Sequence, residues 1–501
     1  MLRAGAEVKT YRQGCTVLHL ASEFGHELVL KLLIDCGAEI NAKMYLKRTA
    51  LHLASENGHE SVVNLLIDCR ARIGAVTNSI ATALHLASEK GHVSVVNLLL
   101  GRGAEIDAKM DLNRTALHLA SENGHESVVN LLIDCRARIG AVTNSNATAL
   151  HLASEKGHVS VVNLLLGRGA EIDAKMDFNR TALHLASKNG HESVVNLLID
   201  CRARIGVVTN SNATALHLAS EKGHVSVVKL LLGRGAEIDA KMDFNRTALH
   251  LASENGHESV VNLLIDCGAR IGAVTNSNAT ALHLASEKGH VSVVNLLLGR
   301  GAEIDAKMDL NRTALHLASE NGHESVVRLL VDHGAIIDAT TIYGEAALHM
   351  ASMNGHVSIV NFLLDRGVTV DAVTILRHTA LHLASRNGHE SVARLLVDRG
   401  ATIDAMTSVA GTSLHMASMS GHALIVNFLL DSGAAIQGRN CASYTALHLA
   451  SLNGHESVVH LLLYRGAADH INDITRCQKT ALQLAWRHPA IAQLLQSRGA
   501  K

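Results

Sequence analysis

The chain has 501 residues, of which 48% are apolar but only 2% aromatic, and its formal net charge is −1. This balance, with acidic and basic residues interspersed, excludes a broad basic face for nucleic acid or anionic lipid. Apolar runs such as residues 164–166 fall far short of the roughly 20 residues of a membrane-spanning helix, so we expect no membrane insertion.

The N-terminal segment, MLRAGAEVKT, lacks the apolar core of a signal peptide. We therefore expect the chain inside the cell, in the cytoplasm, with the nucleus as the alternative. Residues 2–8 (LRAGAEV) match LGRGAEI, the end of a later repeat. We predict that residues 1–12 are the tail of a truncated repeat, so that the sequence starts in mid-repeat.

From residue 13 onward, a Leu-His pair recurs every 33 residues without drift. The fourteen histidines of these pairs are His19, His52, His85, His118, His151, His184, His217, His250, His283, His316, His349, His382, His415 and His448. This period, with its Thr-x-Leu-His-x-Ala core, predicts a solenoid in which each unit contacts only its neighbours. Residues 13–476 would thus form fourteen repeats of about 33 residues.

Residues 145–177 show how one repeat is built. Thr148 is a candidate N-cap, whose hydroxyl would accept a backbone N–H of the first helical turn. A first helix is predicted over residues 149–154 and a second over residues 159–166, with an apolar stripe at helical spacing. An extended finger over residues 171–179 leads into the next repeat. Helices this short are marginal alone, so neighbouring copies must supply the missing partner surface.

The pattern T-x-L-H-L-A-x-x-x-G-H-x-x-V-V-x-L-L-x-x-G-A resembles the ankyrin repeat family over essentially residues 1–501. The resemblance implies an all-α ankyrin-repeat α-solenoid, in which helix-turn-helix pairs with extended hairpin fingers stack superhelically. The family usually has Pro after the Thr, where this chain has Ala149 and its equivalents, with Val17 and Ser413 as exceptions. Ala is a good first-turn residue, so we expect the fold to survive this departure.

A second period of 66 residues lies over the first until about residue 328, after which the copies diverge. Residues 85–150 and 151–216 differ at only three positions, which indicates recent tandem duplication of a two-repeat unit. Nearly identical copies suit a repetitive partner or no specific partner. The divergent stretch could hold a unique epitope, or it could have drifted neutrally.

The residue after the second helix is usually Gly, as at Gly169, and a left-handed cap is expected there. Three repeats carry Arg70, Arg136 and Arg202 instead. Either these arginines carry a steric cost that Gly would avoid, or each is retained for a contact with an acidic residue of the next repeat.

Histidine and cysteine recur at fixed repeat positions, as metal ligands might. The Leu-His set and a Gly-His set, from His26 to His455, hold 28 of the 33 histidines. We interpret both sets as structural imidazoles that tie the first helix to its cap and to the neighbouring hairpin, as the resemblance also implies. Five cysteines at one repeat position are strung along the axis, too far apart for a disulfide or for convergent ligands. We expect no metal and no cofactor.

The repeat pattern breaks at the C-terminus. Leu482-Gln483 replaces the Leu-His pair, and the only Trp and Pro of the chain, Trp486 and Pro489, lie in the same segment. A polar tail follows, and the ends of a solenoid need a polar outer face. Residues 477–501 are therefore predicted to form a C-terminal capping repeat.

The sequence contains no glycine-rich phosphate loop, no Cys-x-x-Cys pair and no His-Glu-x-x-His helix. We predict a non-enzymatic, monomeric scaffold or adaptor that binds other proteins on a long concave surface. The alternative is a regulatory or sensor arm of a longer protein, whose N-terminal effector domain (nucleotide-binding, kinase or similar) is absent from this chain.

Candidate partner-binding residues lie at the finger tips and at exposed positions of the first helix, which line the concave face in the family that the chain resembles. Six of the ten Phe and Tyr residues, Tyr11 among them, lie at or beside finger tips. Binding hot spots favour such aromatic anchors, although each ring could instead pack on an adjacent finger. The candidates are Tyr45, Asp111, Leu112, Arg114, Phe178, Phe244, Ile342, Tyr343, Glu345, Met353, Ile375, Leu376, Arg377 and Tyr444.

Overall fold

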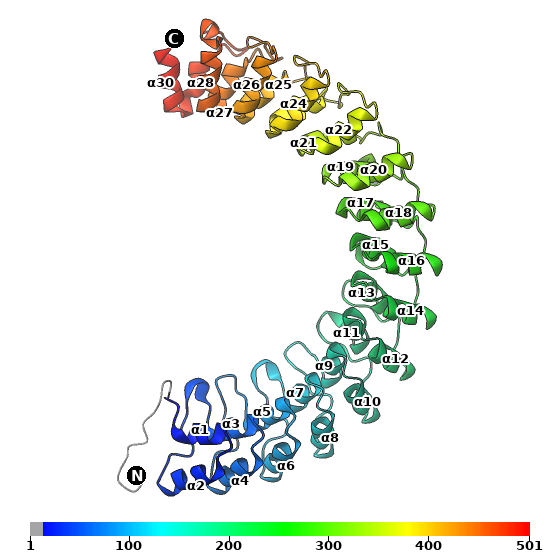
Figure 1. The fold of residues 1–501 in the computed structure, drawn as a ribbon, viewed down its shortest axis with the longest axis vertical. Helices are drawn as coiled ribbons and strands as arrows, with labels where there is room; N and C mark the ends of the chain where they lie inside the picture. Colours follow the sequence, from blue (N-terminus) through cyan, green and yellow to red (C-terminus); the bar gives the residue numbers. More distant parts are fainter. Residues whose placement is uncertain (1–13) are drawn as a thin grey trace. The chain divides into compact units, whose positions relative to one another are not determined.

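The computed structural model describes residues 14–501, and all regular secondary structure in this range is helical (Figure 1). Thirty α-helices follow one another in pairs along these residues. The all-α solenoid expected from the repeat pattern is confirmed. The predicted repeat tail over residues 1–12, with Tyr11, lies outside the described residues.

The chain divides into two compact units, Met1–Asp243 with Asp266–Gly268, and Phe244–Ile265 with Ala269–Lys501. The helices of the first unit are α1 (Val17–Glu23), α2 (Glu27–Asp35), α3 (Ala50–Glu56), α4 (Glu60–Asp68), α5 (Ala83–Lys90), α6 (Val93–Gly101), α7 (Ala116–Glu122), α8 (Glu126–Asp134), α9 (Ala149–Lys156), α10 (Val159–Gly167), α11 (Ala182–Asn189), α12 (Glu192–Asp200), α13 (Ala215–Glu221) and α14 (Val225–Gly233).

The second unit continues the same alternation of helices. Its helices are α15 (Ala248–Glu254), α16 (Glu258–Asp266, of which Asp266 belongs to the first unit), α17 (Ala281–Lys288), α18 (Val291–Gly299), α19 (Ala314–Glu320), α20 (Glu324–Asp332), α21 (Ala347–Met353), α22 (Val357–Asp365), α23 (Ala380–Asn387), α24 (Glu390–Asp398), α25 (Ser413–Ser420), α26 (Ala423–Asp431), α27 (Ala446–Asn453), α28 (Glu456–Tyr464), α29 (Ala481–Leu484) and α30 (Pro489–Ser497).

The pair α9 and α10 shows why the repeat folds this way. Leu150 of α9 and Val161, Val162 and Leu165 of α10 are almost completely buried, as the apolar stripe predicted. Each helix extends slightly beyond its predicted end, and α9 stops at Gly157, whose φ of 82° is left-handed. Neither helix has enough apolar surface to bury alone, so the core forms between repeats.

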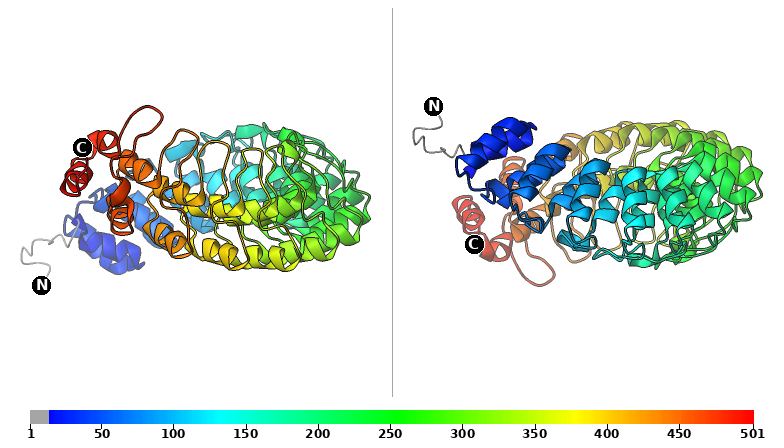
Figure 2. Two further views of the ribbon diagram at one scale, coloured as in Figure 1. Left: turned by 90° about the horizontal axis from the view of Figure 1, so that it is seen from above. Right: turned by 90° about the horizontal axis from the view of Figure 1, so that it is seen from below.

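Within each unit, helices stack in two rows (Figure 1). The first helix of each pair packs on the first helix of the next, as α1 does on α3 and α21 on α23. The second helices pack in the same way, as α2 does on α4 and α22 on α24. Figure 2 shows the fingers as narrow loops that leave the helical rows between successive pairs. One unbroken apolar layer therefore runs between the rows of each unit.

The fingers end in tight turns that are linked by backbone hydrogen bonds. The 3₁₀ turns of five fingers are Tyr45–Lys47, Asp111–Asn113, Asp177–Asn179, Asp243–Asn245 and Asp309–Asn311. Leu112 lies in the left-handed region with φ 62°, and its carbonyl accepts the N–H of Asn144 in the next finger at 2.8 Å. A bulky residue in this conformation is strained, and the bond between fingers offsets part of that cost.

The caps after the second helices are left-handed, as predicted. Gly169 has φ 85°, and the arginines at this position have similar values, 68° at Arg70, 73° at Arg136 and 70° at Arg202. Within residues 14–501 the side chains of these arginines form no ion pair or hydrogen bond, so no acidic contact explains why they are retained.

The C-terminal repeat has a shortened first helix. α29 spans only Ala481–Leu484 and is followed by a 3₁₀ turn over Ala485–Arg487, where the Arg487 guanidinium lies 4.3 Å from the centre of the exposed Trp486 ring. Pro489 opens α30, where its missing N–H costs nothing. The capping role of residues 477–501 stays a prediction.

Candidate partner-binding surface

The Leu-His histidines take part in the N-terminal cap of the first helix of each repeat. In α7 the backbone N–H of the N-cap residue Thr115 donates to Nδ1 of His118 at 3.1 Å, and the Thr115 hydroxyl lies 2.9 Å from the same nitrogen. The same arrangement at Thr148 and His151 shows that the imidazole, and not the hydroxyl alone, caps the helix. Ala346 keeps the bond from its N–H to His349 without any hydroxyl, which confirms that the imidazole suffices.

The hydrogen bonds of His118 fix its protonation state. Its Nε2 lies 3.1 Å and 3.2 Å from the carbonyl oxygens of Ala141 and Ala147, which can only accept, so Nε2 carries the proton. Nδ1 must then be the acceptor for Thr115. Protonation of both nitrogens would break this arrangement, and burial lowers the pKa of His118 to about 4. The structural interpretation of this histidine set is supported, since each ring joins its cap to the following hairpin.

The Gly-His histidines join each repeat to the previous one. Nε2 of His158 lies 2.9 Å from the carbonyl oxygen of Glu122, at the end of the preceding first helix. The ring lies against Gly124, where an added Cβ would come within 2.6 Å of Nδ1. Gly124 is also left-handed, with φ 78°, so its backbone and its neighbour both require glycine.

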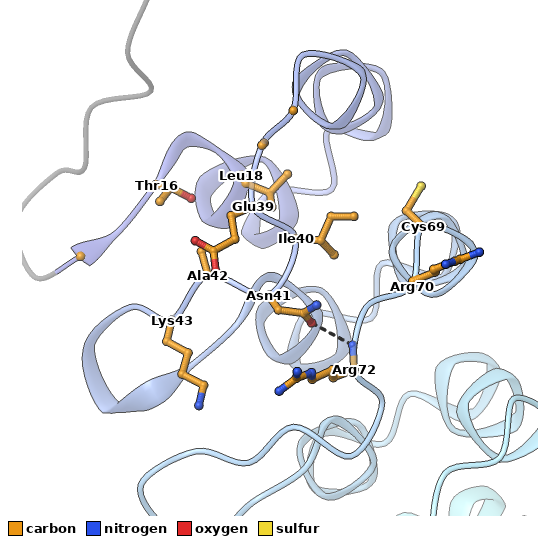
Figure 3. Close-up of a pocket in the computed structure, with 13 residues that line it drawn as sticks. Thr16, Leu18, Glu39, Ile40, Asn41, Ala42, Lys43, Cys69, Arg70 and Arg72 are labelled. Carbon is orange, nitrogen blue, oxygen red and sulfur yellow. Dashed lines mark hydrogen bonds between the residues drawn. The ribbon is translucent and has the colours of Figure 1, made fainter.

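A hollow at the base of the fingers recurs along the array. Near the start of the described chain it measures about 960 Å³, and Figure 3 shows it lined by Thr16, Leu18, Glu39, Asn41 and Arg72, among others. The Asn41 side-chain oxygen accepts the backbone N–H of Arg72 at 2.9 Å. A corresponding hollow in the second unit, about 410 Å³, is lined by the equivalent segment 302–307. Because it recurs at repeat positions, we interpret it as a groove of the architecture.

A second recurring cleft contains several predicted binding residues. Leu112 at the finger tip, Arg114 and Glu122 line a cleft of about 290 Å³ together with Leu152 and Met176. Arg114 and Glu122 form an ion pair inside it. The equivalent cleft at Phe244, about 330 Å³, holds the pair Arg246–Glu254. Asp111 is exposed beside the first cleft, and its N–H donates to the carbonyl oxygen of Ser79 at 3.0 Å.

Four of the predicted aromatic residues are exposed at finger tips. The exposed fractions are 56% for Tyr45, 62% for Phe178, 71% for Phe244 and 54% for Tyr343. Tyr444 differs, because it occupies the repeat position of Arg114, is half-buried, and lies edge-on to His448 with ring centroids 6.1 Å apart. The ring of Tyr444 therefore packs within its own repeat, which is the alternative that the sequence left open, and its role in partner binding stays a prediction.

The last duplicated finger and the first divergent fingers form a run of apolar tips that we call the apolar finger patch, made of Leu310, Ile342, Tyr343, Ile375 and Leu376. All five are exposed, Ile375 most of all at 67%. Their fingers are joined by bonds from the Ile342 N–H to the Leu310 carbonyl and from the Ile375 N–H to the Tyr343 carbonyl, each 2.9 Å. These bonds hold the five side chains in one continuous row.

The remaining predicted residues of this stretch surround the patch. Arg377 directly follows the tip residues Ile375 and Leu376 and is exposed, with φ 59°. Glu345 is half-buried and bonds within its own finger, where its carboxylate accepts from the Thr341 hydroxyl at 3.3 Å. Met353 ends α21 at the repeat position of Glu122, so here the Arg–Glu ion pair is replaced by Glu345 and Met353.

The family was identified by comparison with family models. The model described as "Ankyrin repeats (3 copies)" matches eight overlapping stretches, residues 1–77, 18–110, 84–176, 150–242, 237–308, 304–374, 367–440 and 414–501. The chain belongs to the ankyrin repeat family. Ankyrin repeats generally act as protein-interaction modules.

A solved structure, the human ASB11 ankyrin repeat domain, is similar to the chain at 30% sequence identity. It covers 44% of this chain and 98% of its own, with a TM-score of 0.41. No curated protein sequence matches the chain.

Residues 14–501 of this ankyrin array lack two other kinds of feature. They contain no group of three or more His, Cys, Asp or Glu side chains that could hold a metal ion. No helix among them is both long and apolar enough to cross a membrane. The Gly167-Arg168-Gly169 segment has a structural role, because Arg168 pairs with Asp134 of the preceding repeat at 2.7 Å.

Sequence reasoning missed two features of this ankyrin surface. The first is the Arg–Glu ion pair, whose partners are eight residues apart, one just before the first helix and the other at its end. The second is Val409, which is exposed at the finger tip after the patch. A comparison of each tip with its copies, residue by residue, would have found Val409.

Proposed function

We propose that this chain is a non-enzymatic scaffold or adaptor, and that the apolar finger patch is its main protein-binding surface. The observation that carries the proposal is the row of exposed apolar tips at Leu310, Ile342, Tyr343, Ile375 and Leu376. Apolar side chains gain free energy when a partner covers them, and large contiguous patches of this kind mark interaction sites.

The duplicated fingers strengthen the proposal by contrast. There the corresponding tips alternate between Asn144-Ser145 and Asp111-Leu112, so polar residues separate the apolar ones. The patch fingers read Ile342-Tyr343 and Ile375-Leu376. The backbone hydrogen bonds between fingers are the same in both regions. The substitutions therefore change the exposed side chains of the tips and leave the backbone of the fingers unchanged. A partner that fits the patch should bring an apolar segment.

The chain supplies its own matched variant for the test. Ile342→Asn, Tyr343→Ser and Ile375→Asp together restore the residues that the duplicated fingers already carry, so the variant should fold. Leu424→Asn, an exposed apolar residue on α26 outside the patch, serves as the control. Each full-length protein is used for proximity labelling in cells, and the partner found is then purified and titrated by calorimetry.

We expect the triple variant to weaken binding of that partner by at least about tenfold, and the control to change it less than about twofold. Cross-links should map to the fingers over residues 342–376. Equal affinity for the triple variant and the wild type, or cross-links confined to the second helices, would contradict the proposal. Unchanged melting temperatures would show that the loss is not one of folding.

A further inference from the structure

Four repeats pair an arginine just before the first helix with a glutamate at its end. The pairs are Arg48–Glu56, Arg114–Glu122, Arg246–Glu254 and Arg312–Glu320. The repeat of α11 keeps the arginine, as Arg180, but has Lys188 in place of the glutamate. It therefore carries two cations where its copies carry an ion pair.

Arg180 is left without a carboxylate partner among residues 14–501, and its Nε is buried with no hydrogen-bond partner. Its guanidinium carbon lies 5.1 Å from the centroid of the exposed Phe178 ring at the finger tip. Lys188 is half-buried at the end of α11 and forms no ion pair within the same range. The Nε of Arg312 is buried in the same way although its terminal nitrogen pairs with Glu320, so the feature that distinguishes Arg180 is the missing carboxylate at its terminal nitrogens. A cation that lacks the carboxylate its copies have favours an incoming anionic acceptor.

Acidic groups on the neighbouring helices do not neutralise these two cations. Glu155 of α9 is exposed, and Glu221 of α13 pairs with Lys222 at 2.9 Å. Glutamates at the same positions, such as Glu89 and Glu287, flank the repeats that keep the ion pair. The difference between the copies is thus the exchange of Glu for Lys, which changes the local charge from −1 to +1 at this position.

We propose that Arg180, Lys188 and Phe178 form a binding site for an anionic side chain of a protein partner. The repeat of α7 shows this kind of contact within the molecule, because there the Glu122 carboxylate pairs with Arg114, the equivalent of Arg180. A partner's carboxylate or phosphate would take that place on Arg180, with Lys188 as the second cation and Phe178 alongside. The cleft beside Arg114 in the repeat of α7, about 290 Å³, shows that this repeat position offers room for one side chain and not for a whole small molecule.

The inference rests on a protein-binding role for the array but not on the apolar finger patch, so the two can fail separately. The test is fluorescence anisotropy of a labelled hexaglutamate peptide titrated with the full chain at low salt, where charge pairing is least screened. Lys188→Glu restores the sequence of the other copies and should fold as they do. Lys229→Glu, an exposed change on α14, controls for net charge.

We expect Lys188→Glu to weaken peptide binding by about tenfold or more, because it restores the internal pair and adds a repulsive charge. Lys229→Glu should weaken it by less than about twofold. The reverse change, Glu122→Lys, frees Arg114 and should add a second site, so that twice as much peptide binds per chain. A phosphoserine peptide run in parallel identifies the preferred anion.

Equal losses from Lys188→Glu and Lys229→Glu, or no gain from Glu122→Lys, would overturn the proposal and leave only nonspecific charge attraction. Binding of the phosphoserine peptide alone, with the same dependence on Lys188, would assign the site to phosphate. A protein that lost the apolar finger patch through Ile342→Asn, Tyr343→Ser and Ile375→Asp should still bind hexaglutamate normally.

Discussion

The duplicated repeats and the divergent repeats share one framework and differ in what they display. In both regions a buried histidine joins its helix cap to the next hairpin, as at His118 and His382. Both also link finger tips by backbone bonds, from Asn144 to Leu112 and from Ile375 to Tyr343. The tips themselves change from alternating polar and apolar to two consecutive apolar fingers, Ile342-Tyr343 and Ile375-Leu376. A framework built from backbone and buried side chains leaves exposed positions free to vary.

The largest expected effect tests whether the framework is truly common to both regions. Burial lowers the pKa of His52, His118, His184 and His382 to about 4, below the value of about 6.5 in an unfolded chain. The folded state keeps the full contribution of these neutral histidines above pH 6.5 and loses it as the pH falls toward 4. At pH 5, each such histidine should lower the free energy of unfolding by roughly 2 kcal/mol relative to pH 7. Urea unfolding between pH 7 and pH 5 measures the loss.

Hydrogen exchange at pH 5 then sharpens the comparison, since helices of both regions should lose protection together. His382→Gln is the control, because Gln483 already fills this position in the last repeat and accepts the Thr480 N–H at 3.2 Å. At pH 7 the variant should be less stable by about 1–3 kcal/mol, and its stability should change less between pH 7 and pH 5 than that of the wild type. Acid sensitivity confined to one region would show that the framework is not shared.

An intermediate effect compares two left-handed glycines of successive repeats. An added Cβ at Gly124 would lie 2.6 Å from the His158 ring, whereas Gly103 has open space and only the backbone cost. Gly103→Ala should cost about 1 kcal/mol, and Gly124→Ala about 1–3 kcal/mol more. Thermal unfolding measures both.

The same contrast should hold in the divergent region. An added Cβ at Gly355 would lie 2.5 Å from the ring of His389, whereas Gly367 meets nothing within 4 Å. Similar costs for Gly355→Ala and Gly367→Ala would mean that the histidine contact is not equally tight in the two regions.

The smallest expected effect concerns the residue at the C-terminal cap of the second helix, which differs between the two regions. The divergent repeats keep glycine there, as at Gly334, Gly367, Gly400 and Gly433, whereas Arg136 and Arg202 lie in the duplicated region. Arg136→Gly and Arg202→Gly should each stabilise by a few tenths to about 1 kcal/mol, because steric relief outweighs the added chain entropy. The reverse change, Gly268→Arg, should cost about as much. Destabilisation by either glycine variant would indicate a contact of the arginine in solution.

The repeat geometry could be predicted from the sequence because it depends on local signals. Thr148, the Leu-His pair and Gly169 mark the start and end of helices that the structure places within one or two residues of expectation. The sequence could not decide whether the Tyr444 ring is exposed or packed, because its burial depends on the contact with His448 of the following helix. Lys188 was visible as one of three differences between copies, but its meaning depended on the distant Arg180.

Before the C-terminal break, the histidine bonds between repeats connect positions at a constant separation along the chain. The carbonyls that accept from these histidines lie 23 and 29 residues ahead or 36 residues behind, whereas His448, next to the break, bonds Asp473, 25 residues ahead. Unequal crossing-over between two copies therefore yields a chain in which every donor still finds its acceptor. A gene built this way can gain or lose a 66-residue unit in one recombination event without a folding defect, so array length can evolve faster than the residues that hold it together.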